Sequence, residues 1–153
     1  MDSRDLEGRS AIVTGGSRGI GLAIAQALAA HGASVTIAAR NLDTVVSAAE
    51  HIRERGGKAL AVDIDIVGDG AADVIVSRTL EAFGGLDILV NNAGGNSFSS
   101  PVASMRVGGW EKTMKLNVDA TLRMIQAAVP PLVASARGSI VNVGSIEIGR
   151  AHV

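Results

Sequence analysis

A glycine-rich turn near the start of the chain has the residue types and the spacing to bind phosphate. The turn, Thr14-Gly15-Gly16-Ser17-Arg18-Gly19-Ile20-Gly21, lies between an apolar run at residues 10–13 and a helical pattern at residues 22–30. Glycine permits positive φ and lets the backbone approach a ligand with no Cβ in the way. The N–H groups and dipole at the start of a helix attract a diphosphate. A glycine cluster can also simply end a strand, but its place between strand and helix favours nucleotide binding.

The residues after the second predicted strand indicate which dinucleotide would bind. An acid at that place accepts hydrogen bonds from a ribose 2′-hydroxyl and favours NAD, whereas this chain has Arg40. A guanidinium pairs well with a 2′-phosphate, and Arg18 in the turn supplies a second one. Either arginine alone is as readily explained as a solvated surface residue. The two together favour NADP(H) as the cofactor, with NAD(H) the less favoured alternative.

These residues need a framework of alternating strands and helices. Near-continuous apolar runs separated by helical patterns predict an α/β fold, a doubly wound parallel sheet with helices on both faces. Right-handed crossovers give the strand order 3-2-1-4-5. The pair Pro130-Pro131 is expected to end the last helix. Strands are predicted at residues 10–13, 33–38, 58–64, 86–90 and 139–143, and helices at 22–30, 42–55, 69–83 and about 110–129.

The remaining candidate residues follow the predicted strands. Ligands of such sheets bind at the carboxyl ends of strands near the point where the strand order reverses, here between the first and fourth strands. Small residues after the fourth strand leave room for a ribose, and asparagine amides there satisfy exposed backbone groups. The carboxyl ends carry the glycine turn, Arg40, Asp63 with Ile64, the stretch Asn91-Asn92-Ala93-Gly94, and Gly144-Ser145.

The turn Thr-Gly-x-x-x-Gly-x-Gly, followed later by Asn-Asn-Ala-Gly after an apolar strand, resembles the short-chain dehydrogenase/reductase family, and its 3-oxoacyl reductases in particular. The spacing differs from the general Gly-x-Gly-x-x-Gly fingerprint and from a P-loop. The resemblance implies a Rossmann fold and hydride transfer between NADP(H) and a carbonyl or alcohol substrate. It places Asp63 beside the adenine, where a simple turn aspartate is the alternative. The implied cofactor-binding residues are Gly15, Ser17, Arg18, Gly19, Ile20, Gly21, Arg40, Asp63, Ile64, Asn91, Ala93 and Gly94.

The resemblance also implies catalytic roles. Ser145 matches the serine that holds the substrate oxygen, and Asn117 matches the helix asparagine that supports a water-linked proton path. Without the upstream motifs, Ser145 would be interpreted as a turn former and Asn117 as a residue that bonds backbone. The family's acid/base tyrosine has no counterpart, because the chain contains no tyrosine. Its lysine has none either, because Lys58, Lys112 and Lys115 lie at other places in the order. We therefore expect residues 1–153 to be a single, incomplete NAD(P)-binding Rossmann domain, a fragment that lacks the family's last two strands and is inactive alone.

Composition limits the other classes of function. Hydrophobic residues make up 47% and charged residues 19%, with a net charge of −1, which argues against disorder and against a nucleic-acid-binding surface. There is no cysteine, and the histidines lack metal-ligand spacing, so no metal site is expected. No apolar stretch reaches the ~18 residues of a membrane span, and a cytoplasmic location is expected.

Two function classes remain from the sequence. The first is the oxidoreductase, with a small-molecule carbonyl or alcohol as its partner and a possible homo-oligomer. The second is a non-catalytic nucleotide-binding or subunit-pairing module. The second class would function without a proton donor. In the fragment, Ile140, Val141 and Val143 are expected on an edge strand that is liable to recruit another chain.

Overall fold

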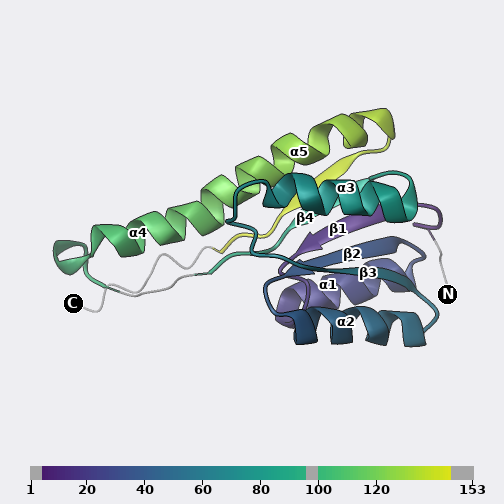
Figure 1. Cartoon of the computed structure of the whole chain (residues 1–153), viewed down its shortest axis with the longest axis horizontal. Coiled ribbons are helices and arrows are strands. Elements are labelled where there is room, and N and C mark those ends of the chain that lie inside the picture. The colour runs from purple at the N-terminus through teal and green to yellow at the C-terminus, as the bar shows by residue number, and fades with distance from the viewer. Residues whose placement is uncertain (1–4, 96–99, 146–153) are drawn as a thin grey trace.

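Five parallel strands form the centre of the molecule (Figure 1). The computed structural model describes residues 5–95 and 100–145. Its strands are hydrogen-bonded in the order β3-β2-β1-β4-β5, which confirms the predicted doubly wound α/β sheet and its 3-2-1-4-5 order. The strands are β1 (Ser10–Thr14), β2 (Ser34–Ala39), β3 (Lys58–Asp63), β4 (Ile88–Asn91) and β5 (Ser139–Asn142).

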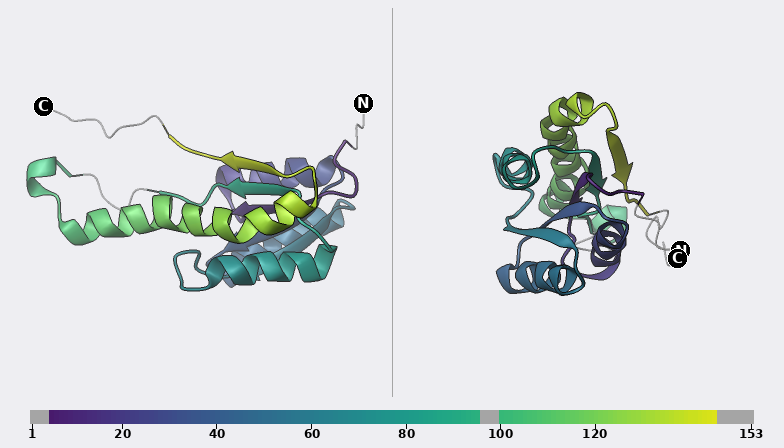
Figure 2. Two further views of the ribbon diagram at one scale, coloured as in Figure 1. Left: turned by 90° about the horizontal axis from the view of Figure 1, so that it is seen from above. Right: turned by 90° about the vertical axis from the view of Figure 1, so that its right-hand side faces the viewer.

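Helices cover both faces of this sheet (Figure 2). They are α1 (Gly19–Ala30), α2 (Leu42–Glu54), α3 (Ala71–Phe83), α4 (Val107–Met114) and α5 (Ala120–Ala134), with a 3₁₀ turn η1 (Val102–Ser104) and a π-helical turn η2 (Lys115–Asp119). Alternate residues of β1 show the two layers, because Ala11 and Val13 pack with α1 and α2 while Ile12 packs with α3 and α5. Strands that are buried on both faces have no polar face, which explains the near-continuous apolar runs in the sequence.

The prediction that Pro130 and Pro131 end the last helix is wrong. α5 continues through both prolines to Ala134. Proline removes an N–H donor but keeps its carbonyl, and its fixed φ suits a helix. The carbonyl of Pro131 accepts a hydrogen bond from the Ser135 N–H at 3.0 Å. Leu132, 5% exposed, packs in the core between the helix and the sheet. Tertiary packing therefore outweighs the local cost of the proline pair.

The continuous helical segment formed by α4, η2 and α5 reaches beyond the sheet at its α4 end. Figure 1 shows α4, η2 and α5 as one long rod whose α4 end projects past the strands. None of the α4 side chains is buried, whereas α5 buries Ala120, Met124, Ala128 and Leu132. Among the residues that the structure describes, no helix has the length and apolar character needed to cross a membrane.

Candidate functional site

The glycine turn joins β1 directly to the first turn of α1. The helix begins at Gly19, inside the turn, rather than at residue 22 as the sequence pattern suggested. Gly15 and Gly19 have φ of +64° and +55°, values that an L side chain adopts only with strain. Arg18 is the N-cap residue, its backbone is extended, and its side chain makes no capping hydrogen bond. The first N–H groups of α1 are therefore left without a side-chain cap, at the end of the helix that attracts anions.

Two glycines in the turn allow it to pack closely against the loop after β4. A Cβ added at Gly15 would lie 3.0 Å from the Cα of Ala93. A Cβ added at Gly21 would overlap the Nδ2 of Asn92 and the carbonyl oxygen of Gly15. Side chains at these positions would separate the two loops, so the glycines keep the carboxyl ends of β1 and β4 in contact.

Thr14 fastens the same two loops through its side chain. Its Oγ1 accepts hydrogen bonds from the backbone N–H groups of Asn92 and Ala93, both at 3.0 Å, and donates to the carbonyl of Val90 at 3.4 Å. The Asn92 amide in turn donates to the carbonyls of Thr14 at 3.0 Å and Gly15 at 3.2 Å. The sequence prediction did not include Thr14 or Asn92 among the site residues. Their positions in the motifs were the available indication, because Thr14 precedes the first glycine of the turn and Asn92 is the second asparagine of the Asn-Asn pair.

The arginines predicted to bind the extra phosphate are exposed at this edge. Arg18 belongs to the turn, and Arg40 directly follows β2. The next residue, Asn41, caps α2 by accepting a hydrogen bond from the Thr44 N–H at 2.9 Å. Asn41 is therefore occupied in fixing the start of α2, while the neighbouring Arg40 side chain is exposed to solvent.

The end of β3 lies next to the end of β2. Asp63 is paired in register with Ala39, the residue before Arg40, and the Ile64 N–H donates to the Ala39 carbonyl at 2.9 Å. Asp63 is exposed and Ile64 is half-buried. Asp63 and Ile64 thus lie at the strand end next to the one that Arg40 follows, and their contact with an adenine stays a prediction.

The first asparagine after β4 faces the end of β5. The Nδ2 of Asn91 donates to the Oδ1 of Asn142 at 2.8 Å, and the Asn91 carbonyl accepts the Val143 N–H at 2.9 Å. Asn91 is 4% exposed, and its Oδ1 is buried with no hydrogen-bond partner among the described residues. A buried acceptor without a donor is costly. Its position at the carboxyl edge leaves one polar atom for a ligand or a water molecule.

Asn117, which lies in η2 between α4 and α5, is hydrogen-bonded to the loop after β4. Its Oδ1 accepts the Gly95 N–H at 3.0 Å, and its Nδ2 donates to the carbonyls of Gly95 at 2.8 Å and Thr113 at 2.9 Å. A Cβ on Gly94 would lie 2.8 Å from the Asn117 Oδ1, so this approach needs glycine. Asn117 lies in η2, and π-helical turns are frequent at functional sites.

Ser145 is exposed and follows β5 at the same carboxyl edge. The structure therefore gathers the predicted residues at one edge of the sheet, from the ends of all five strands and from η2. Within residues 5–95 and 100–145, no group of three or more metal-ligating side chains lies close enough together to hold a metal ion.

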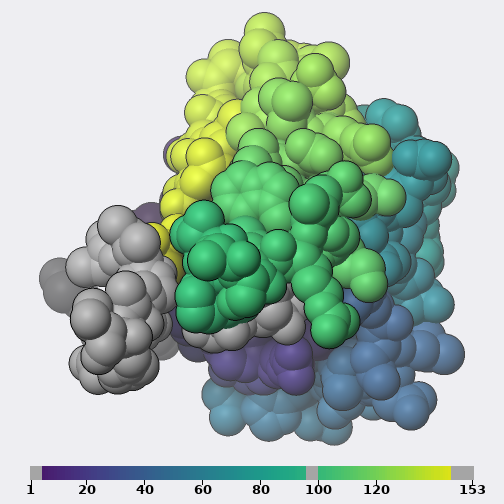
Figure 3. All heavy atoms as spheres, turned by 90° about the vertical axis from the view of Figure 1, so that its left-hand side faces the viewer, coloured from purple at the N-terminus to yellow at the C-terminus, as the bar shows by residue number. Residues whose placement is uncertain are grey.

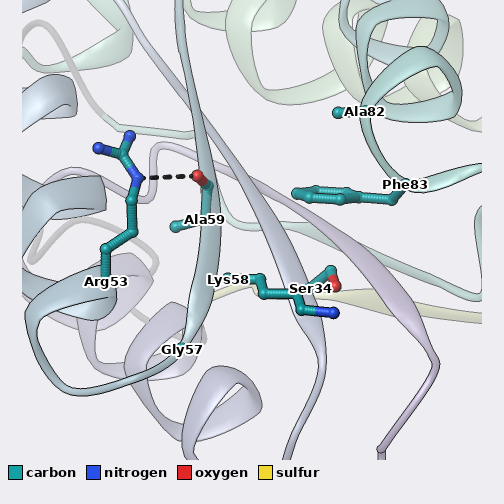
Figure 4. Close-up of a pocket in the computed structure, with 7 residues that line it drawn as sticks. All are labelled: Ser34, Arg53, Gly57, Lys58, Ala59, Ala82 and Phe83. Atoms are coloured by element: carbon teal, nitrogen blue, oxygen red, sulfur yellow. Dashed lines mark hydrogen bonds between the residues drawn. The ribbon is translucent and has the colours of Figure 1, made fainter.

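A hollow of about 430 Å³ lies at the opposite edge of the sheet (Figure 4). It involves the amino ends of β2 and β3, whereas the motif residues occupy the carboxyl ends. We therefore do not assign this hollow to a dinucleotide. Its lining residues are Ser34, Arg53, Gly57, Lys58, Ala59, Ala82 and Phe83.

A parallel, doubly wound sheet with a glycine turn at the start of its first helix is the arrangement of a Rossmann-type nucleotide-binding domain. The sequence model described as short chain dehydrogenase matches residues 9–152. The chain belongs to the short-chain dehydrogenase family of oxidoreductases, which confirms the resemblance found in the sequence.

Curated relatives agree with this assignment. The chain is 40% identical over 145 residues to the rhamnolipids biosynthesis 3-oxoacyl-[acyl-carrier-protein] reductase of Pseudomonas aeruginosa, a match that covers 92% of this chain and 56% of that protein. It is 36% identical over 141 residues to the 2,5-dichloro-2,5-cyclohexadiene-1,4-diol dehydrogenase LinX of Sphingobium indicum, with 92% and 56% covered. The chain thus spans little more than half the length of these relatives.

Solved structures show the same architecture. A 7α-hydroxysteroid dehydrogenase complexed with NADH and 7-oxo glycochenodeoxycholic acid matches with a TM-score of 0.90 and 31% identity, over 97% of this chain and 58% of that one. A metagenomic short-chain oxidoreductase in complex with NADP matches with a TM-score of 0.86 and 35% identity, over 92% and 64%. One neighbour holds NADH and the other NADP.

Proposed function

We propose that this chain binds NADP(H), in preference to NAD(H), at the carboxyl edge of its sheet. We further propose that it forms the cofactor-binding part of an oxidoreductase acting on a small carbonyl or alcohol substrate. The observation that carries the proposal is that the start of α1, in the glycine turn, has no side-chain cap. Hydrogen bonds to the Thr14 side chain hold this turn against the loop after β4. On this proposal, residues 1–153 are a single, incomplete NAD(P)-binding domain. When bound, the nicotinamide would supply or accept the hydride.

The turn residues would hold the diphosphate. Backbone N–H groups at the start of α1 point along the helix axis toward an anion, and the absence of Cβ atoms at the glycines leaves the approach open. A Cβ on Gly19 would meet nothing within 4 Å, which marks the open side of the turn. The proposed contacts to the diphosphate and its neighbouring groups come from Gly15, Ser17, Arg18, Gly19, Ile20 and Gly21.

The outer part of the site would recognise the adenosine half. Arg40 and Arg18 would pair with the 2′-phosphate, since a guanidinium forms two parallel, charge-assisted hydrogen bonds with such a group. Asp63 and Ile64, on the strand end beside Arg40, would contact the adenine.

The inner part of the site would serve the ribose and the chemistry. Asn91, Ala93 and Gly94 would line the ribose pocket. We assign to Ser145 the holding of the substrate oxygen and to Asn117 the support of a proton path. Asn117 is already fixed by three hydrogen bonds, so it would enter a site that is ordered before substrate arrives.

The arginine contribution is tested by NADPH and NADH titrations of the purified chain, followed by nucleotide fluorescence. Replacing Arg40→Asp removes a positive charge and adds a negative one, so we expect NADPH affinity to fall at least about ten-fold while NADH affinity changes little. Arg78→Asp makes the same charge change on an exposed residue of α3, and we expect it to leave both affinities near wild type. Equal losses in the two variants would refute the role of Arg40.

A further inference from the structure

The backbone that leads to Arg40 is held by hydrogen bonds from two neighbouring elements. The Ala38 carbonyl accepts the Gly15 N–H at 2.8 Å, which joins the end of β2 to the glycine turn. The Ala39 carbonyl accepts the Ile64 N–H at 2.9 Å, which joins the same strand to the end of β3. The last two residues of β2 are therefore fixed on both sides before the chain reaches Arg40.

Asn41 fixes the chain on the other side of Arg40. It is the N-cap residue of α2, and its Oδ1 accepts the Thr44 N–H at 2.9 Å. The Asn41 carbonyl accepts the Thr44 hydroxyl at 3.1 Å and the Val45 N–H at 3.0 Å. Val45 is fully buried, so these bonds connect Asn41 to the packed part of α2. Of the α-helices in the described part of the chain, α2 alone has a side-chain cap at its N-terminus.

The Arg40 side chain, by contrast, is exposed at the carboxyl edge of the sheet. Figure 3 looks onto this edge, where the purple surface of the first part of the chain lies beside the blue surface of the α2 region. A guanidinium forms two parallel hydrogen bonds with a phosphate only in a narrow range of orientations, so the position of the Arg40 backbone affects whether they form. Holding that backbone before the ligand arrives reduces the ordering that binding must bring about.

Given the NADP(H) binding proposed above, on which this inference rests, we infer that Asn41 is a positioning residue for Arg40. By capping α2 it holds Arg40 where the guanidinium pairs with a 2′-phosphate, and it raises the preference for NADPH without contacting the nucleotide. Without the cap, the first turn of α2 is less stable, and Arg40 has more positions to lose when NADPH binds. NADH carries no 2′-phosphate, so its affinity does not depend on how Arg40 is held.

Nucleotide titrations of variants at residue 41 test this role. Asn41→Ala removes the cap, whereas Asn41→Ser keeps one, because serine is about as good an N-cap residue as asparagine. We expect Asn41→Ala to lower NADPH affinity about three- to ten-fold with little change for NADH, and Asn41→Ser to bind both nucleotides as the wild type does. Ser47→Gly, at an exposed position inside α2, weakens the same helix but leaves its cap, and should not change the ratio of the two affinities.

A double-mutant cycle shows whether Asn41 acts through Arg40. In an Arg40→Ala background, Asn41→Ala should cause no further loss of NADPH affinity, because no guanidinium is left to position. An Asn41→Ala loss of the same size in both backgrounds would mean that Asn41 contacts the nucleotide itself, and would overturn the positioning role.

Amide hydrogen exchange of the chain without nucleotide, followed by NMR, measures the cap itself. The Thr44 amide should exchange slowly in the wild type and in Asn41→Ser, and faster in Asn41→Ala. The positioning role is overturned if the preference for NADPH survives in Asn41→Ala, if Thr44 exchanges alike in all three chains, or if Ser47→Gly changes the affinity ratio equally. Equal affinities of the wild type for NADPH and NADH would instead refute the proposed preference for NADP(H) and the positioning role together, so the two failures are distinguishable.

Discussion

Removing the hydroxyl of Thr14 is the sharpest test of how the site is held together. Thr14→Val keeps the shape of the buried side chain, which is 1% exposed, but deletes the acceptor shared by the N–H groups of Asn92 and Ala93. Each buried donor left without a partner costs about 1–3 kcal/mol. Both N–H groups are only partly buried, and water partly replaces the lost acceptor, so we take the lower end for each. The free energy of unfolding should fall by about 2–3 kcal/mol.

The measurement is urea unfolding followed by circular dichroism, with Thr14→Ser as the matched control. Serine keeps the oxygen and loses one methyl group, which costs about 1 kcal/mol. The valine variant should also bind NADPH more weakly than the serine variant, because the loop from Asn92 to Ala93 is no longer fixed to the glycine turn. Equal unfolding free energies for the two variants would refute the view that Thr14 fastens these loops.

Two further substitutions test local geometry, each against a neighbour. Ala136 has φ of +56°, so Ala136→Gly should raise the free energy of unfolding by about 0.5–1 kcal/mol in thermal denaturation. Ala134→Gly, at the last residue of α5, should instead lower it, by less than the ~1 kcal/mol of a helix interior. Gly94→Ala places a Cβ 2.8 Å from the Asn117 Oδ1 and should lower stability by about 1–2 kcal/mol, while Gly95→Ala, which meets nothing within 4 Å, should cost less than half of that. A loss of stability in Ala136→Gly would contradict the first expectation, and equal unfolding free energies of Gly94→Ala and Gly95→Ala would contradict the second.

The sequence predicted the sheet well because its strands are short apolar runs between clear helix stops. Gly56-Gly57 and Gly84-Gly85 each follow a predicted helix. These stops and the alternation of strand and helix left few possible topologies, and the observed order is the predicted one. The start of α1 could be predicted less well from the sequence, because the pattern indicates Gly19 and Gly21 as turn residues although both belong to the helix. Local propensity also predicted a stop at Pro130, where the packing of Leu132 carries the helix onward.

Contacts between distant segments could not be predicted from local pattern. The Thr14 Oγ1, at the end of β1, accepts a hydrogen bond from the Asn92 N–H, after β4. The sequence does not show which of several polar residues would make this contact. The π-helical turn around Asn117 leaves no mark in the periodicity of the helix. The hydrogen bond from the Arg53 Nε to the Ala59 carbonyl, at 3.1 Å, joins α2 to β3 and likewise could not be predicted from the local pattern.

An NMR titration of the chain with NADPH would locate the dinucleotide, which we propose lies over the glycine turn at the carboxyl edge of the sheet. We expect the largest amide shifts at residues 15–21, 40 and 91–94, with smaller shifts at the same residues for NADH at equal concentration. Shifts confined to the hollow near Arg53 and Lys58, or no shifts with either nucleotide, would contradict this proposal.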